Sequence, residues 1–474
     1  MLFNISPLDG RYKERLNSLS NYFSEAALMK YRVLIEIEWL IYLFNDLQLK
    51  GTKKFIPQDL RLLRQIYEKF DEKSATEVKT IEGETNHDVK AIEYFIKEKI
   101  KGTEIEEYDE FVHFGCTSED INNLAYALMV KDFTSMEYLP TLKTILQELF
   151  DLAQSNKDVP MISRTHGQPA SPTTLGKEVI NFVSRIENQL KNFEMKNVFM
   201  GKMNGAVGNF NAHLIAYPEI DWSKATNIFV QAMGLKANSY TTQIEPHDSQ
   251  AELYHLFIRI NNILLDLSRD FWTYISLGYF NQKTNKGEIG SSTMPHKINP
   301  IDFENAEGNI GISNALFQHL ANKLPISRLQ RDLSDSTAQR NIGSACAHTI
   351  LSFKSILKGI NKLEVNHDKI SQDLQDHWEL LAEPIQTVMR KNHIPKAYEK
   401  LKDLTRGEKI DQEAVQTFIE TLSIPNEDKE QLLSLTPEKY IGMASKLVSD
   451  YKLKYSSGEQ GCGPKGCGTC NGCG

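Results

Sequence analysis

Reactive side chains gather in one polar segment of the sequence, residues 285–300 (NKGEIGSSTMPHKINP). Among the groups that it offers on irregular backbone are the hydroxyls of Ser291 and Ser292, the imidazole of His296, the ammonium of Lys297 and the amide of Asn299. Gly287 and Gly290 precede the serines and can act as pivots. A polar loop of this length in a helical protein is functional or disordered. We interpret it as a lid that closes on a substrate and excludes water; a flexible surface turn is the alternative.

An imidazole and two guanidinium groups stand in other segments. His166 lies in SRTHGQPASP (163–172), where glycine and prolines exclude a continuous helix. An imidazole titrates near neutral pH and can therefore give a proton to a departing nitrogen. Arg331 and Arg340 can each bind a carboxylate or phosphate through two parallel hydrogen bonds, and Ser336 between them can add a hydroxyl.

Thr117 and Ser118 precede a helical pattern that has Asp120 in its first turn. This order predicts a helix cap. The free N–H groups of a helix N-terminus also bind anions, so a cap and a carboxylate-binding site are compatible here.

The elements that must position these residues are helices. In 251–280, apolar side chains recur every three or four residues, which predicts one long amphipathic helix. Four further stretches show the same pattern: 141–153, 173–195, 303–322 and 337–363. No alternation typical of strands is sustained. The sequence therefore predicts an all-α fold with a central bundle of long helices.

Breaks in these patterns predict three helical domains and a tail. We expect an N-terminal helical domain over 1–110, a central bundle with the lid over 111–365, and a C-terminal helical domain over 366–455. The tail 456–474 is rich in glycine and cysteine and has too few apolar residues to form a core. Its cysteine spacing could hold zinc or an iron–sulfur cluster, but we interpret it as a disordered appendage.

Charge and composition exclude several classes of protein. The formal net charge is −8, which argues against general nucleic-acid binding. The most apolar stretches, such as Leu253–Leu267, contain charged residues, so no membrane span is expected. The N-terminus lacks the pattern of a signal peptide. Cys116 and Cys346 stand far apart in the body, which favours a reducing, cytoplasmic location. The spacing of the body histidines and carboxylates indicates no metal site, and no cofactor is expected.

The segment GSSTMPHKINP resembles the signature loop GSSxMPxKxN of the fumarase/aspartase superfamily. That loop does not distinguish among the members of the superfamily. Other segments resemble the adenylosuccinate lyase family, and the opening SPLDGRY resembles its bacterial form. The resemblance covers about 1–455 and rests on motifs in the expected order: TNHDVKA (85–91), FGCTSEDINN (114–123), SRTHGQPASP, TTQIEPHD (241–248) and RLQRDLSDSTAQR (328–340).

The resemblance implies an anti β-elimination that releases fumarate. The substrates would be adenylosuccinate, giving AMP, and the succinylaminoimidazole carboxamide ribonucleotide of purine biosynthesis, giving the aminoimidazole carboxamide ribonucleotide. Another fumarate-releasing lyase, such as an argininosuccinate lyase, is the alternative. A non-catalytic scaffold on the same fold would be expected to lose His166, Ser291 or Lys297, and all three are present. The resemblance also implies a cytoplasmic homotetramer whose active sites take residues from three subunits.

Specific roles follow from the same resemblance. His166 would be the general acid and Ser291 the general base, and Glu304 would pair with His166 to orient its ring. A hydroxyl is a poor base, so Ser291 would need help from Lys297, backbone N–H groups and exclusion of water. From its position alone, Glu304 is equally an exposed residue in a first helical turn. Substrate binding would involve Arg11, Tyr12, Asn86, His87, Asp88, Thr117, Ser118, Gln243, Ser292, Lys297, Asn299, Asn305, Arg331, Ser336 and Arg340.

Overall fold

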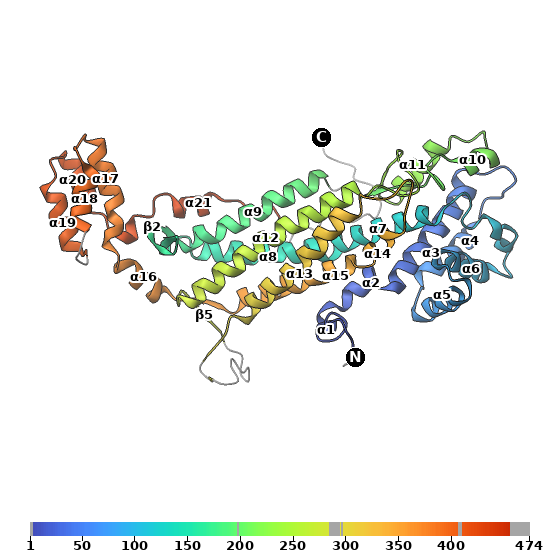
Figure 1. Cartoon of the computed structure of the whole chain (residues 1–474), viewed down its shortest axis with the longest axis horizontal. Helices are drawn as coiled ribbons and strands as arrows, with labels where there is room; N and C mark the ends of the chain where they lie inside the picture. Colours follow the sequence, from blue (N-terminus) through green and yellow to red (C-terminus); the bar gives the residue numbers. More distant parts are fainter. Residues whose placement is uncertain (1–2, 197–198, 284–293, 295–296, 406–409, 456–474) are drawn as a thin grey trace.

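The computed structural model describes residues 3–196, 199–283, 294, 297–405 and 410–455. The predicted base Ser291, its neighbour Ser292, most of the lid and the cysteine-rich tail lie outside these ranges. Figure 1 shows an elongated molecule in which a bundle of long helices connects two groups of shorter helices, one at each end.

The central bundle contains the predicted long helices. Helix α12 (Asp248–Ser276) contains the apolar stripe expected in 251–280, and its Phe257, Ile260 and Leu264 are fully buried. Helix α13 lies against both α12 and α15. No helix in the described ranges is long and apolar enough to cross a membrane. The other bundle helices are α7 (Ser118–Phe133), α8 (Leu139–Ser155), α9 (Leu175–Lys196), α13 (Ile301–Lys323) and α15 (Ile342–Asn361).

The N-terminal end has its own cluster of buried apolar residues. This cluster draws on residues 29–128 and also on 203–235, a segment from the middle of the chain. The N-terminal helices are α1 (Lys13–Leu16), α2 (Ser20–Phe23), α3 (Glu25–Ile41), α4 (Pro57–Glu68), α5 (Glu72–Thr85) and α6 (Asp88–Ile100). The middle segment adds α10 (Asn211–Ala216) and α11 (Trp222–Ala232).

The C-terminal end is built from short helices around a third apolar cluster that includes Leu381, Met389 and Leu432. Its helices are α17 (Ala382–Lys391), α18 (Ala397–Thr405), α19 (Gln412–Thr421) and α20 (Asn426–Leu433), whereas α16 (His367–Gln375) buries Ile370 and Leu374 in the core of the bundle. Helix α21 (Ala444–Asp450) returns to the bundle, where Ser445 donates a hydrogen bond to the carbonyl of Lys157.

Short strands connect some of the helices in three two-stranded sheets. Strands β1 (Pro160–Thr165) and β2 (Gln168–Thr174) form an antiparallel hairpin. Strands β3 (Met200–Gly201) and β4 (Lys236–Ala237) pair in parallel, and β5 (Phe280–Gln282) pairs antiparallel with β6 (Leu363–Val365). These sheets are small, and the all-α prediction is confirmed.

One predicted helix was wrong in its extent. The stretch 337–363 is not continuous, because α14 (Ser334–Gln339) ends before α15 begins at Ile342. Asn341, between them, has φ −97° and ψ 1°, outside the helical region. Asp335 and Gln339 of α14 are buried, and the Gln339 amide lies 3.4 Å from the His247 ring. The break therefore lets α14 bury these polar side chains against another segment.

Candidate active site

Arg331 joins three of the sequence motifs at the N-terminal end of α7. Its Nη1 donates to Oε1 of Gln243 at 3.2 Å, and its Nη2 donates to Oγ of Ser336 at 3.4 Å. The same Nη2 lies 3.4 Å from Oε2 of Glu119, in the first turn of α7. Gln243 is held in turn by donating to the carbonyl of Ala206. The structure therefore brings together three predicted substrate-binding residues, Arg331, Gln243 and Ser336.

The 86–88 motif contacts the other predicted arginine, Arg340, through Asp88. Its Oδ2 is 2.7 Å from Nη2 of Arg32 and 3.4 Å from Nη2 of Arg340. Burial opposes ionisation of Asp88, but the two arginines and the hydrogen bonds from Arg32 and the Val89 N–H lower its pKa overall. A negative Asp88 thus fixes the Arg340 side chain beside the first turn of α6. Sequence reasoning missed Arg32, whose side chain is buried and also donates to Asn122.

His87, one of the predicted substrate-binding residues, caps helix α6 and keeps an exposed side chain. It precedes α6 in extended conformation, and its Nδ1 accepts from the N–H of Lys90 at 3.1 Å. This contact leaves Nε2 of an exposed ring for other partners. Asn86 ends α5 in the left-handed region, with φ 51°, which asparagine tolerates better than most residues. The two residues together make the sharp turn between α5 and α6.

The cap predicted at 117–120 is confirmed. Helix α7 begins at Ser118, and Oδ2 of Asp120 accepts from the N–H of Thr117 at 2.8 Å. The other oxygen of Asp120 accepts from the N–H of Asn204 and lies 3.1 Å from Nζ of the fully buried Lys202. The glycine-rich segment 201–211 therefore packs onto the start of α7 and fixes the position of Thr117 and Ser118.

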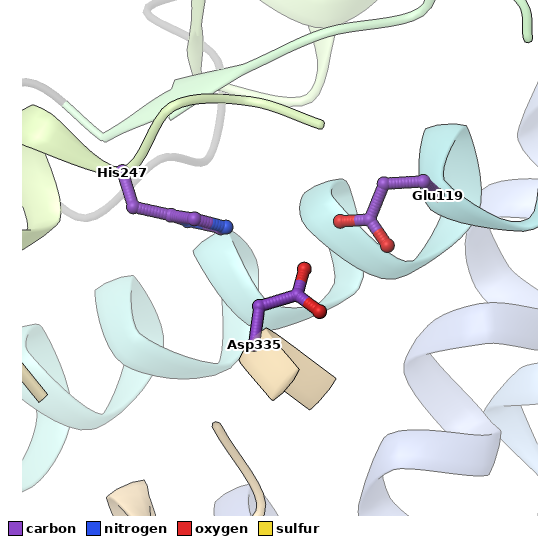
Figure 2. A group of neighbouring side chains, drawn as sticks. All are labelled: Glu119, His247 and Asp335. Carbon is purple, nitrogen blue, oxygen red and sulfur yellow. The ribbon is translucent and has the colours of Figure 1, made fainter. Parts of the chain in front are cut away.

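Three buried side chains that sequence reasoning missed lie directly behind Arg331. Ligand-type atoms of Glu119, His247 and Asp335 all lie within 4.8 Å of one another. Figure 2 shows the ring and the two carboxylates pointing toward one another. Burial raises the pKa of Glu119 to about 8 and lowers the pKa of His247. The three positions lie in motifs noted above, but nothing in their spacing along the chain indicates contact.

His166 lies at the tip of the β1–β2 hairpin. His166 and Gly167 have φ of 54° and 77°, which is the pattern of a two-residue type I′ turn. The imidazole is exposed and has no hydrogen bond or ion pair to any described residue of its own chain. The predicted irregular backbone is thus a hairpin, whose arm β1 packs against α16.

A separate group surrounds the first turn of α13. Nδ2 of Asn305 donates to the hydroxyl of Tyr12 at 3.5 Å, and the Arg11 guanidinium lies 5.9 Å from the Tyr12 ring centre. Glu304 is exposed in the first helical turn, as its position indicated, and its Oε1 accepts from Nε1 of Trp272 at 3.1 Å. Within the described residues of one chain, Glu304 therefore contacts Trp272 and makes no hydrogen bond or ion pair with His166.

The described end of the lid leads into this same turn. The N–H of Lys297 donates to the carbonyl of Met294 at 3.0 Å, and the carbonyl of Asn299 accepts from the N–H of Ile301 at 2.8 Å. The Lys297 side chain is exposed. Lys297 and Asn299 thus belong with Glu304 in sequence and in space, whereas Ser291 and Ser292 lie outside the described residues.

One chain places the predicted residues in separate groups. In Figure 1, α14 and the start of α7, which carry the Arg331 group, lie toward the N-terminal end of the bundle, and the β1–β2 hairpin lies at the opposite end. The residues of a single chain therefore do not form one complete pocket of the predicted composition.

Comparisons with known proteins identify the family. A family model described as lyase matches residues 10–312, and one described as adenylosuccinate lyase C-terminal matches 327–441. The chain is 51% identical over 449 residues to adenylosuccinate lyase of Escherichia coli strain K12, covering 94% of this chain and 98% of that protein. It is 52% identical over 453 residues to adenylosuccinate lyase of Legionella pneumophila strain Corby, with the same coverage.

Two solved structures share the fold at low identity. A fumarate lyase from Mesorhizobium sp. BNC1 aligns with a TM-score of 0.73 and 16% identity, covering 91% of this chain and 96% of that one. A 3-carboxy-cis,cis-muconate lactonizing enzyme from Pseudomonas putida aligns with a TM-score of 0.73 and 19% identity, covering 91% and 95%. The fold similarity, the two family models and the near full-length identity agree: the chain belongs to the adenylosuccinate lyase family.

Proposed function

We propose that this protein releases fumarate from adenylosuccinate, giving AMP, and from the succinylaminoimidazole carboxamide ribonucleotide, giving the aminoimidazole carboxamide ribonucleotide. The observation that carries the proposal is the 51% identity over 94% of the chain to an adenylosuccinate lyase. Both reactions break the same bond, between a nitrogen and the succinyl carbon. One site can therefore serve both substrates.

The reaction sets three demands on the site. A base must remove a weakly acidic proton from the carbon next to a carboxylate, and an acid must protonate the departing nitrogen. Two carboxylates and a phosphate must be held by cations and aimed donors. We assign Arg331 and Arg340 to substrate anions, because neighbouring side chains hold the Arg331 guanidinium at the start of α7 and the Arg340 guanidinium at the first turn of α6. Ser336, Gln243, Thr117 and Ser118 would complete this part of the site.

His166 is our proposed general acid. The type I′ turn projects its exposed imidazole beyond the hairpin, where it can enter a site formed by another chain. Ser291 is the proposed base, assigned from the loop that it shares with the superfamily. We assign Glu304 to orient His166 across a subunit boundary. Lys297, Asn299 and Asn305 would hold the succinyl group beside it, and Arg11 and Tyr12 would contact the phosphate.

We further propose that the chain acts as a homotetramer with shared active sites. The segment that carries Arg331 supports this, since Ile326, Leu329 and Leu333 are 67, 91 and 70% exposed in the single chain. Large apolar side chains gathered on one segment favour burial against another protein surface. The separation of the Arg331 group from the His166 hairpin is a second support. Two free body cysteines, Cys116 and Cys346, agree with the proposed cytoplasmic location.

A spectrophotometric assay tests the proposed function directly. Purified protein is mixed with adenylosuccinate, and fumarate and AMP are measured as products, with argininosuccinate as a matched substrate that also releases fumarate. We expect turnover of adenylosuccinate and none of argininosuccinate. Folded tetramer that leaves adenylosuccinate unchanged would overturn the proposal, and turnover of argininosuccinate alone would move the chain to the other activity.

A further inference from the structure

The Glu119 carboxyl is enclosed and only partly bonded. The residue is 1% exposed, its Oε2 lies 3.4 Å from Arg331, and its Oε1 has no hydrogen-bond partner among the described residues. Opposite it, Oδ1 of Asp335 accepts from the N–H of Ser336, whereas Oδ2 is also buried without such a partner. Each carboxyl thus has one buried oxygen without a donor, and ligand-type atoms of the two residues lie within 4.8 Å of each other. Two buried carboxyls this close indicate that one of them carries a proton.

The charges around Glu119 are close to balance. The first turn of α7 and the guanidinium of Arg331 favour the ionised carboxylate, whereas burial and Asp335 favour the protonated acid. Burial is the largest influence, and it brings the pKa of Glu119 to about 8. The charged and titratable groups that face this carboxyl from the packed elements are Asp120, Lys202, Glu245, His247, Arg331 and Asp335.

An anion bound by Arg331 would change this balance. Arg331 is the positive group nearest to Glu119, and a substrate carboxylate or phosphate on the guanidinium would cancel much of its attraction for the Glu119 carboxylate. We propose that Glu119 takes up a proton when Arg331 binds an anionic group of the substrate. Glu119 is then a positioning residue, which acts on the substrate through Arg331. This inference rests on the proposed function, because it uses Arg331 as a substrate-binding residue.

The hydrogen bonds of the His247 ring favour a proton, rather than a metal ion, at the site formed by Glu119, His247 and Asp335. Its Nδ1 lies 3.0 Å from Oε1 of Gln250, which can only accept, so Nδ1 carries the ring hydrogen. Nε2 then accepts from the amide of Gln339 at 3.4 Å, and burial keeps the ring neutral. The lone pair that a metal would need is engaged, and the Arg331 guanidinium already contacts the carboxylate of Glu119.

The pH dependence of KM has a definite sign. Below pH 8 the Glu119 carboxyl is protonated, so binding an anion at Arg331 needs no further proton. Above pH 8 the ionised carboxylate competes for Arg331, and each binding event must take up one proton. With a pKa of about 8, KM for adenylosuccinate is expected to rise about tenfold between pH 7 and pH 9.

Two substitutions of Glu119 distinguish the effect of its charge on KM from the effect of its shape. Glu119→Gln is permanently neutral and nearly isosteric, so its KM should match the wild type at pH 7 and stay within about twofold up to pH 9. Glu119→Ala removes the support of Arg331, so its KM should be raised at every pH, with kcat less affected. Glu36→Gln is the matched control, because Glu36 is another buried carboxyl that contacts His113 and not Arg331.

Calorimetry measures the proton itself. AMP and fumarate are titrated separately into the wild-type tetramer at pH 8.5, in two buffers with different heats of ionisation. We expect uptake of a substantial fraction of one proton with the anion that Arg331 binds, and no uptake in Glu119→Gln. Uptake with AMP assigns Arg331 to the phosphate, and uptake with fumarate assigns it to a carboxylate.

Several outcomes would overturn the inference. It fails if Glu119→Gln keeps the full rise in KM, if neither ligand takes up a proton, or if Glu36→Gln abolishes the rise equally well. If the purified wild type contains a stoichiometric divalent metal that Glu119→Gln loses, then the site holds a metal cation and not a proton. These failures differ from failure of the proposed function, in which the wild type itself would not cleave adenylosuccinate.

Discussion

Asp88 and Arg340 lie 252 positions apart in the sequence, and their side chains meet at 3.4 Å. The contact joins the first turn of α6 to the residue that follows α14. The same carboxylate oxygen lies 2.7 Å from the buried Arg32, so Asp88 bridges two guanidiniums. One of them is enclosed and structural, and the other is 54% exposed and free to meet a ligand.

Because of this difference, we expect Arg340→Ala to lower mainly activity and Asp88→Ala to lower stability. Arg340→Ala should lower the free energy of unfolding by at most about 1 kcal/mol, because half-exposed ion pairs contribute little. It should lower kcat/KM about tenfold to a hundredfold, as expected for losing a charged hydrogen bond to substrate. Asp88→Ala should cost about 2 kcal/mol of stability, because the Arg32 guanidinium would stay buried without a carboxylate partner, with only Asn122 to accept from it.

Urea unfolding and steady-state kinetics measure the two effects on the same samples. Arg64→Ala is the matched control: Arg64 lies on α4, is 43% exposed and pairs with Glu38. Its kcat/KM should stay at the wild-type value. An Arg340→Ala variant with normal kcat/KM and a large loss of stability would reverse the assignment.

The sequence predicts the helices because their periodicity is local. The stripe through Phe257, Ile260 and Leu264 marks α12 without knowledge of its neighbours. The break at Asn341 escaped prediction because it depends on burying Gln339 and Asp335 against segments distant in sequence. Apolar residues continue on both sides of the break, so the local pattern alone cannot show it.

The candidate site likewise has some features that the local sequence predicts and others that it does not. Irregular backbone at His166 follows from local glycine and proline, but the hairpin pairing of β1 with β2 does not. The buried contacts among Glu119, His247 and Asp335 need three distant segments to fold together. Proximity of this kind leaves no periodic trace in a sequence.

Substituting His166 tests the general acid. Asn tolerates the left-handed region, so His166→Asn should keep the hairpin tip while removing the proton donor. We expect kcat to fall by about 10² to 10⁴, the usual contribution of general acid catalysis. His393→Asn is the matched control, since His393 is also exposed with φ 56°. Near-normal kcat in His166→Asn would exclude the assignment.

Substituting Ser291 tests the proposed general base. Ser291→Ala should leave a folded tetramer whose kcat is lower by orders of magnitude, because no other group takes the proton. Circular dichroism and size-exclusion chromatography check the fold and the assembly, and the adenylosuccinate assay gives kcat. Ser292→Ala is the neighbouring control, and we expect it to raise KM more than it lowers kcat. The reverse result would exchange the roles of the two serines.

His113 gives a pH-dependent contribution to stability. Its Nδ1 lies 2.6 Å from Oε1 of the buried Glu36. Burial disfavours the imidazolium, but Glu36 outweighs it and the pKa of His113 is raised. A raised folded-state pKa stabilises the fold fully below the unfolded value of about 6.5, and this stability is lost as pH rises through the folded value.

The measurement compares urea unfolding of the wild type and His113→Asn at pH 6 and pH 9. Asn fits the left-handed backbone at φ 65°, so the turn is kept. The variant should be less stable by about 2 kcal/mol at pH 6, and the difference should shrink at pH 9. A difference that grows with pH would show that the pair is neutral in the folded protein.

Mixing two inactive variants tests whether active sites are shared. If one site takes His166 and Arg340 from different chains, co-expressed His166→Asn and Arg340→Ala chains form some sites with both residues intact. Random assembly gives about a quarter of sites intact, so activity should recover to roughly that share of wild type. Two affinity tags isolate the mixed tetramers for the assay.

A second mixture provides the control. Arg331 and Arg340 flank α14 in one chain, so a site that takes both from the same chain is never repaired by mixing Arg331→Ala with Arg340→Ala. We therefore expect recovery in the first mixture and none in the second. Purified mixed tetramers of the first kind that stay inactive would mean that one chain supplies both His166 and Arg340. In that case the opposite ends of the bundle would have to meet within a single chain, which contradicts their separation along it.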